Sequence, residues 1–177
     1  MKRLTLLTLF CLCGMAAMGQ DITQKATRGS FFVMPGASYG RTYSYSLMAG
    51  YVKDWGGYVR YKSNLASKGE VGTGVKDAFY DDSFAKLGRT SYNAGVMKKM
   101  FNRVYFYAGL GYGSSWVQWK TAEKKTIVEI EDLSFSGVDP EIGAIYRYGV
   151  LVVGVGGNML IGKKLIPEAN LSVGIAF

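Results

Sequence analysis

Histidine is absent from this chain of 177 residues, and its only two cysteines are Cys11 and Cys13. Both cysteines lie in a segment that we expect to be removed, so the mature chain is predicted to have neither a thiol nor an imidazole. This excludes a disulfide framework and the usual cysteine or histidine metal ligands. It also excludes acyl transfer in which a histidine takes the proton from a serine nucleophile. The sequence therefore predicts no enzymatic activity, no cofactor and no metal site.

The first residues follow the order of a secretory signal peptide. Lys2 and Arg3 precede an apolar run over residues 4–13, and Ala17 and Gly19 fit the −3 and −1 positions of a cleavage site. The apolar run is too short to cross the ~30 Å hydrocarbon core of a bilayer as a helix. We therefore expect a cleaved signal peptide over residues 1–19 and one exported domain over residues 20–177.

Proline and long apolar runs are also scarce. The chain has 3 prolines, and after residue 19 no apolar run approaches the ~20 residues of a transmembrane helix. Glycine is abundant, at 24 residues, as are the 13 tyrosines, 9 phenylalanines and 3 tryptophans. This composition favours strands whose successive side chains face opposite sides of a sheet, with glycine where the sheet curves tightly.

The segment over residues 170–177 has the clearest strand pattern, because bulky apolar residues alternate with small or polar ones. The bulky set is Leu171, Val173, Ile175 and Phe177, and the other set is Asn170, Ser172, Gly174 and Ala176. In a soluble sheet the bulky face would cover a core, whereas in a membrane barrel it would face lipid. The aromatic residue at the last position favours the barrel.

The same alternation recurs in seven segments upstream of this one. The predicted strands cover residues 31–39, 43–52, 57–63, 90–99, 104–119, 136–148, 150–159 and 170–177. Eight is the smallest even number of strands in bacterial single-chain barrels. The sequence thus predicts an all-β fold, an eight-stranded antiparallel up-and-down transmembrane β-barrel.

The predicted connections differ in length at the two ends of this barrel. With the N-terminus in the periplasm, the periplasmic links are residues 53–56, 100–103 and 147–149, and all are short. The outer links are residues 40–42, 64–88, 120–133 and 160–168, of which three are long. Short inner turns and long outer loops are typical of such barrels. Pro35 and Pro140 each remove a backbone donor, so we expect a bulge or a strand end at both.

Aromatic residues are predicted near both ends of the strands, where amphipathic rings favour the two membrane interfaces. The periplasmic set is Tyr51, Trp55, Phe101, Tyr146, Tyr148 and Phe177, and the outer set is Tyr39, Tyr43 and Trp116. A soluble sheet capped by aromatic rings is the competing interpretation of these positions.

The signal, the eight strands and the final Leu-Ser-Val-Gly-Ile-Ala-Phe resemble the small outer-membrane barrels of the OmpA/OmpX type. More narrowly, residues 92–97 (YNAGVM) and 105–112 (YFYAGLGY) are similar to the outer-membrane β-barrel proteins of Bacteroidetes. This resemblance implies the outer membrane of a Gram-negative bacterium and insertion by the barrel-insertion machinery, with Phe177 as the assembly signal. It implies an architecture and hardly any activity, because one fold carries many functions.

The formal net charge of the chain is +8 at pH 7. A basic balance often indicates a nucleic-acid partner, but this chain is predicted to be exported and its basic residues are scattered, so we expect none. Anionic lipopolysaccharide is the expected counter-charge, together with the lipids around the barrel.

Charged residues also occur at positions that the alternation points into the barrel. They are Arg60, Lys62, Asp139, Glu141 and Arg147. Narrow eight-stranded barrels fill their interior with side chains, so one hypothesis is a salt-bridge network that plugs the lumen. The other hypothesis is a gated ion or proton path through the same charges.

The outer loops carry the remaining candidate surface. Residues 64–88 mix aromatic and charged side chains, which suits a protein or glycan partner, and residues 126–131 alternate like a strand that extends the barrel. Asp77, Asp81 and Asp82 lack the spacing of a calcium loop, which favours a solvated loop. We expect a non-enzymatic barrel with a structural or surface-interaction role. The alternatives are an accessory component of an envelope assembly or secretion system, or a narrow channel.

Overall fold

The computed structural model describes residues 29–64, 86–120, 127–129 and 134–177, and every regular element among them is a β-strand. The strands are β1 (Ser30–Tyr39), β2 (Tyr43–Val52), β3 (Trp55–Ser63), β4 (Lys86–Phe101), β5 (Val104–Lys120), β6 (Ile127–Glu129), β7 (Phe135–Val138), β8 (Glu141–Tyr148), β9 (Leu151–Ile161) and β10 (Leu165–Ala176). Within these residues, no helix has the length and hydropathy needed to cross a membrane. The predicted signal peptide and most of the two long outer loops, with Asp77, Asp81 and Asp82, lie outside them.

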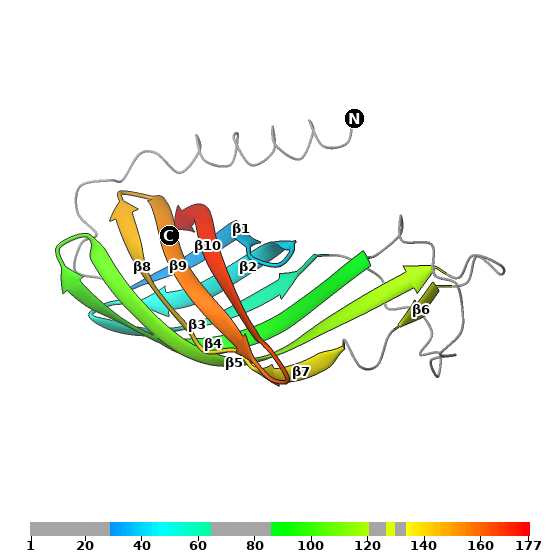
Figure 1. The fold of residues 1–177 in the computed structure, drawn as a ribbon. Coiled ribbons are helices and arrows are strands. Elements are labelled where there is room, and N and C mark those ends of the chain that lie inside the picture. The colour runs from blue at the N-terminus through cyan, green and yellow to red at the C-terminus, as the bar shows by residue number, and fades with distance from the viewer. Residues whose placement is uncertain (1–28, 65–85, 121–126, 130–133) are drawn as a thin grey trace, which may run out of the picture.

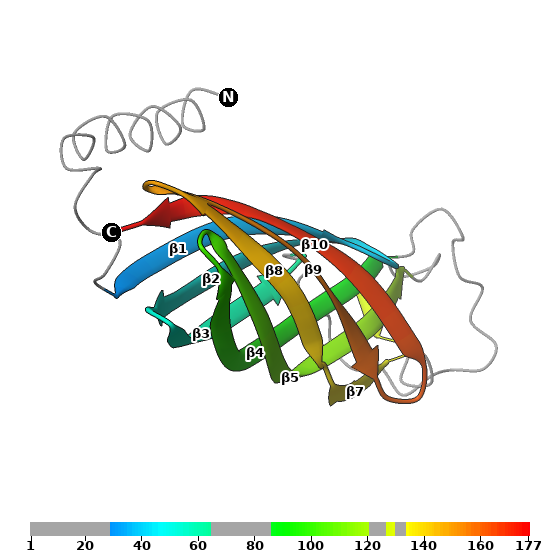
Figure 2. The same cartoon turned by 90° about the vertical axis from the view of Figure 1, so that its left-hand side faces the viewer.

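The strands close into a barrel in which neighbours in sequence are neighbours in space (Figures 1 and 2). The ring is sealed where β1 pairs antiparallel with β10 as well as with β2. β7 and β8 together occupy one strand position of the barrel, because Tyr112↔Val138 and Gly109↔Glu141 belong to the same register against β5. The eight-stranded antiparallel up-and-down barrel predicted from the alternation is confirmed.

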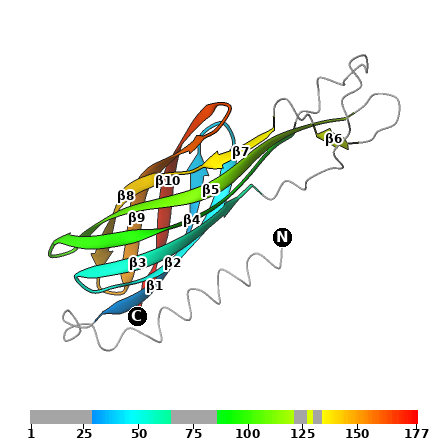
Figure 3. The ribbon, with the colours of Figure 1, turned by 90° about the horizontal axis from the view of Figure 1, so that it is seen from below.

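The barrel is longer on one side than on the other. Figure 3 shows β5 running past the ends of most other strands to reach the short strand β6. β6 pairs antiparallel with the end of β5, with Gln118 opposite Glu129 and Lys120 opposite Ile127. The strand predicted within residues 126–131 is therefore present over Ile127–Glu129, and it extends the sheet beyond the ring.

Two predicted outer links were assigned too many residues. β9 continues to Ile161 and β10 begins at Leu165, so the predicted long link over residues 160–168 is a turn of residues 162–164. β4 likewise begins at Lys86, inside the predicted loop over residues 64–88. Polar and charged side chains that face a lumen alternate with lipid-facing ones, and this alternation continues through Glu168. The prediction that Glu168 belongs to a loop is therefore wrong.

The two prolines within predicted strands have different effects. β7 ends at Val138 and β8 starts at Glu141, so the expected strand end at Pro140 is present. Pro35 lies inside β1 without any register shift, which makes the expected bulge or strand end there wrong. Its missing N–H group interrupts only the ladder with β10, between the pairs Val33↔Ile175 and Gly36↔Ser172.

The faces of the barrel are reversed relative to a soluble protein. Val59 is 60% exposed, Leu110 62% and Ile142 67%, although all three are aliphatic. Buried polar side chains fill positions on the opposite faces of the same strands. An apolar exterior around a closed sheet is stable against lipid, since no edge is left unpaired. The alternation predicted these faces.

Most predicted interface aromatics lie on the lipid-facing surface, including Trp55, Phe101 and Tyr43. Trp116 is the exception, because it is only 3% exposed. Its ring covers Gly88 of β4, the residue directly opposite it in the register. The prediction that Trp116 belongs to an outer interface belt is therefore wrong, and the glycine that accommodates its ring explains why.

Candidate functional site

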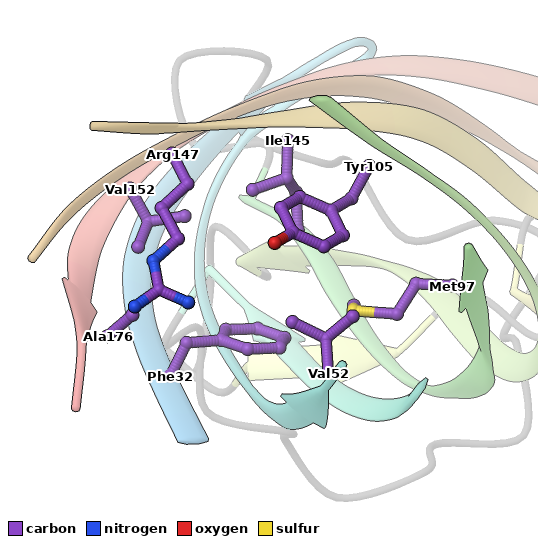
Figure 4. Close-up of a pocket in the computed structure, with 8 residues that line it drawn as sticks. All are labelled: Phe32, Val52, Met97, Tyr105, Ile145, Arg147, Val152 and Ala176. Carbon is purple, nitrogen blue, oxygen red and sulfur yellow. The ribbon is translucent and has the colours of Figure 1, made fainter. Parts of the chain in front are cut away.

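Apolar side chains fill the periplasmic half of the lumen. This apolar layer consists of Phe32, Met34, Met48, Val52, Tyr58, Met97, Tyr105, Tyr107, Ile145, Val152 and Ala176. The cavity that remains among them measures about 10 Å³ (Figure 4). That is the space of about one water molecule. The apolar layer therefore obstructs the axis of the barrel.

Next to the apolar layer, four charged side chains form a closed ring of alternating sign, which we call the ionic ring. Lys62 Nζ lies 3.4 Å from Asp139 Oδ2 and 3.5 Å from Glu168 Oε2. Arg89 Nη2 lies 3.2 Å from the same Asp139 oxygen, and Arg89 Nε lies 3.0 Å from Glu168 Oε1. Each cation thus contacts both carboxylates. All four side chains are at most 1% exposed.

A further ion pair, Arg60–Glu141, contacts the apolar layer. Arg60 Nη1 donates to Glu141 Oε2 at 3.1 Å, and Arg60 Nη2 donates to Tyr107 Oη at 3.2 Å. The guanidinium carbon also lies 5.2 Å from the centre of the Tyr107 ring, within the range of a cation–π contact. With this pair, three cations face three carboxylates, so the formal charges of the cluster cancel.

Asparagine side chains complete the surroundings of the carboxylates. Asn158 Nδ2 donates to Asp139 Oδ1 at 2.5 Å and to Glu168 Oε2 at 3.1 Å. Asn170 in turn donates to Asn158 Oδ1 at 3.1 Å, and Asn93 donates to the backbone oxygen of Asp139 at 2.6 Å. A buried ion pair offsets its loss of hydration only when such additional hydrogen bonds satisfy it.

The backbone explains why these side chains fit inside so narrow a barrel. Asp139 lies in the break between β7 and β8, yet its N–H still donates to Gly111 O at 2.9 Å. The chain therefore stays paired with β5 across the break. A Cβ atom at Gly111 would collide with the side chain of Asn93. Glycine at this position of β5 therefore leaves room for a polar side chain of the neighbouring strand β4.

The structure brings four of the five predicted lumen residues into this cluster, namely Arg60, Lys62, Asp139 and Glu141. Arg147 lies apart, six residues further along β8 from Glu141, which corresponds to about 20 Å of strand. Its guanidinium lies at the periplasmic cavity (Figure 4), where Nη1 donates to Ser30 Oγ at 2.9 Å and Nε donates to Gly149 O at 3.0 Å. The shared face is as predicted, but the length of the strand separates the charges.

Two members of the ionic ring, Arg89 and Glu168, were absent from the sequence prediction. Glu168 had been assigned to the outer link over residues 160–168, and Arg89 lay between the predicted loop over residues 64–88 and the predicted strand over residues 90–99. The alternation does predict that Arg89 faces the lumen, because Arg89, Ser91 and Asn93 follow one another at intervals of two residues and the last two face inward. Glu168 likewise continues the inward set of Asn170 and Ser172.

The outer end of the lumen is covered by a second apolar cluster. Phe135, Leu160 and Ile166 are buried together at the outer ends of β7, β9 and β10. The charged cluster therefore lies between two apolar layers. Among the described residues, no group of acidic, histidine or cysteine side chains has the arrangement of a metal site. Chemically, the arrangement holds charge in place, since every carboxylate of the cluster is already paired with a cation.

Comparison with known proteins rests on structure, because no protein-family model and no curated protein matches this sequence. The crystal structure of Ail, the attachment invasion locus protein of Yersinia pestis, in complex with the heparin analogue sucrose octasulfate is similar with a TM-score of 0.57. The identity is 15%, over 84% of this chain and 96% of that one. The fold is that of the outer-membrane β-barrels.

Two further solved structures of this kind are similar to the barrel. The N-terminal β-barrel domain of Pseudomonas aeruginosa OprF matches with a TM-score of 0.55 and 12% identity, over 85% of this chain and 100% of that one. A major outer membrane protein from Thermus thermophilus matches with a TM-score of 0.57 and 11% identity, over the same shares. At such identities the likeness establishes the architecture alone.

Proposed function

We propose that this protein is a non-enzymatic barrel of the outer membrane that keeps its lumen closed and contacts an anionic saccharide at its outer rim. The observation that carries the first part is the paired cluster of three cations and three carboxylates between two apolar layers. Such a filled interior supports the plug hypothesis over an ion path. The protein then acts through its exposed ends.

Charge at the outer rim supports the second part of the proposal. Arg41 lies in the turn between β1 and β2, and Lys163 and Lys164 lie in the turn between β9 and β10. All three are exposed, and the two turns belong to neighbouring strands. Among the described side chains, Asp54 is the single exposed carboxylate, and it lies at the periplasmic end. The outer rim thus presents cations without nearby exposed carboxylates in the described region.

The ligand class follows from this charge. Lysine and arginine side chains near an anionic surface are each attracted by about 1 kcal/mol. Phosphate groups of lipopolysaccharide are the first anions that an outer rim meets, and sulfated saccharides present similar charge. That the structurally similar Ail was crystallised with a heparin analogue is in keeping with a polyanionic ligand.

A binding experiment on intact cells tests the rim. We expect the triple variant Arg41→Gln, Lys163→Gln, Lys164→Gln to bind a fluorescent sulfated saccharide several-fold less than the original protein at equal surface abundance. The matched control is the triple variant Lys53→Gln, Lys99→Gln, Arg103→Gln, which changes three cations at the periplasmic end. Equal losses in both variants, or no loss in the first, would remove the rim proposal.

A conductance experiment tests the closed lumen. The purified barrel in planar bilayers is expected to give no steady current of porin size. Such a current would instead support the narrow channel, which is the alternative function. Failure of this test and failure of the rim test are independent, because the first concerns the ionic ring and the second the exposed turns.

We further infer export through removal of residues 1–19 and an origin in Bacteroidetes, on the sequence patterns alone. A role of Phe177 in assembly fits its place at the seam, where Phe177 N–H donates to Phe31 O at 2.8 Å and Phe31 N–H donates to Phe177 O at 3.0 Å. We expect Phe177→Ala to fold more slowly into the heat-modifiable form seen on gels, and Phe101→Ala, another exposed aromatic, to fold at the original rate.

A further inference from the structure

The lipid-facing surface of β2, β3 and β4 has a depression of about 470 Å³. Its floor includes Ala49, Val59 and Ala94, which lie directly opposite one another in the registers of the three strands. Across the barrel, each small residue on this face of β8 and β9 is paired with a branched aliphatic one, Gly157 with Ile142 and Ala144 with Val155. On β2 to β4 the sequence instead places alanines on both sides of Val59, which leaves the depression.

A row of larger side chains closes the depression toward the outer end. Leu47, Tyr61, Tyr92 and Tyr112 are consecutive partners across β2 to β5. The rings of Tyr61 and Tyr92 are 5.0 Å apart between centroids and are tilted against each other. Both side chains are exposed on the lipid side, at 42% and 64%. The row forms a ridge. The terminal methyl group of an acyl chain that extends from the periplasmic side would contact this ridge.

Toward the periplasmic end the surface is low only at Gly57, and a cation lies beyond it. The next row contains Tyr51, Gly57 and Val96, which are partners across β2, β3 and β4, and the larger Tyr51 and Val96 side chains are exposed on either side of Gly57. The row after it contains Trp55 and Lys98, and Lys98 Nζ lies 4.8 Å from the centre of the Trp55 ring. Lys98 is exposed and forms no ion pair with any described residue. Four residues of strand separate it from Ala94, a distance of about 13 Å.

We propose that this face binds one phospholipid of the periplasmic leaflet. The headgroup phosphate pairs with Lys98 at the interface marked by Trp55. One acyl chain then runs over Gly57 and fills the depression as far as the ridge of tyrosines. The charge complementarity at Lys98 and the position of the depression within the apolar band favour a lipid over a second copy of the barrel. This site is independent of the saccharide contact proposed for the outer rim.

Native mass spectrometry of the folded barrel in detergent, titrated with phosphatidylglycerol, tests the site. We expect one lipid to stay bound at concentrations where the Ala94→Phe variant binds it ~tenfold more weakly, because the ring fills the depression. Ala169→Phe, an exposed alanine of β10 on the opposite side, is the matched control and should bind as the original protein does. If Ala94→Phe fails to give the heat-modifiable folded form, Ala49→Phe fills the same depression from β2.

The cation is tested separately with diacylglycerol, which has the chains but no phosphate. The original protein is expected to prefer phosphatidylglycerol ~fivefold, and Lys98→Gln should abolish this preference. Equal lipid binding by Ala94→Phe, Ala169→Phe and the original protein would overturn the proposal. So would a dimer free of lipid that dissociates in Ala94→Phe, or lipopolysaccharide that displaces phosphatidylglycerol from the site.

Discussion

The two halves of the lumen are filled in different ways. The periplasmic half contains methionine, aromatic and branched aliphatic side chains, and it holds a cavity of about 10 Å³. The outer half contains the ionic ring of Lys62, Arg89, Asp139 and Glu168 with its asparagine partners. Both halves obstruct the axis of the barrel, but they do so through different interactions. The comparison shows that a narrow barrel has no single way of filling its interior.

The two halves should also respond differently to mutation. An apolar side chain can be shortened at a cost that scales with the atoms removed and the cavity left behind. A buried ion pair behaves otherwise, because removal of one partner leaves an uncompensated charge, whereas removal of both can be nearly neutral. The following predictions measure that difference.

The largest effect is expected for Asp139→Asn. The amide cannot offset the charges of Lys62 and Arg89, both of which contact Asp139 Oδ2. Breaking a buried ion pair on one side costs about 3–5 kcal/mol. We expect a fall of this size in the free energy of unfolding, measured by urea denaturation of the barrel in lipid vesicles.

The control for this variant is Asp54→Asn, in an exposed turn at the periplasmic end. A surface substitution of this kind is expected to change the free energy of unfolding by less than about 0.5 kcal/mol. Equal effects at the two aspartates would show that the ionic ring has no special part in stability.

A smaller effect is expected for Val152→Ala in the apolar layer. Val152 is 2% exposed and lines the periplasmic cavity. Loss of two methyl groups and a partly unfilled space should cost about 2 kcal/mol in the free energy of unfolding. Conductance in planar bilayers should stay absent, because the ionic ring still obstructs the lumen. A steady current in this variant would mean that the apolar layer alone keeps the barrel closed.

The smallest effect is expected when both partners of the Arg60–Glu141 pair are replaced. The double variant Arg60→Met, Glu141→Met removes both charges together, so the free energy of unfolding should change by less than about 1 kcal/mol. Glu141→Gln alone leaves Arg60 unpaired and should cost about 3 kcal/mol. A double variant that is less stable than Glu141→Gln would show that this pair contributes a net attraction.

Much of the barrel could be read from alternation, strand by strand. The range predicted for β2 is the observed one, and in β3 the alternation places Arg60 and Lys62 opposite Val59 and Tyr61, as the structure does. Errors occurred where a predicted strand began too late. Arg89 and Glu168 were left outside the predicted strands, although both lie within β4 and β10 and are buried.

Other features depend on partners that are distant in sequence. Trp116 is buried because Gly88 lies opposite it on β4. Arg147 donates to Ser30 of β1, a partner that only the closed barrel brings near it. Alternation gives the face on which a side chain lies, but it gives neither its neighbours nor its height in the barrel.

The sequence by itself determined the number of strands, their alternating faces and the reversal of polarity between outside and inside. These features depend on the period of two along each strand, which is a local property of the backbone. Only the tertiary structure decided which charges meet in the ionic ring, where the lumen is apolar and where the outer surface is hollowed. These features depend on the register of neighbouring strands and on closure of the sheet, which bring together residues from β3, β4, β9 and β10.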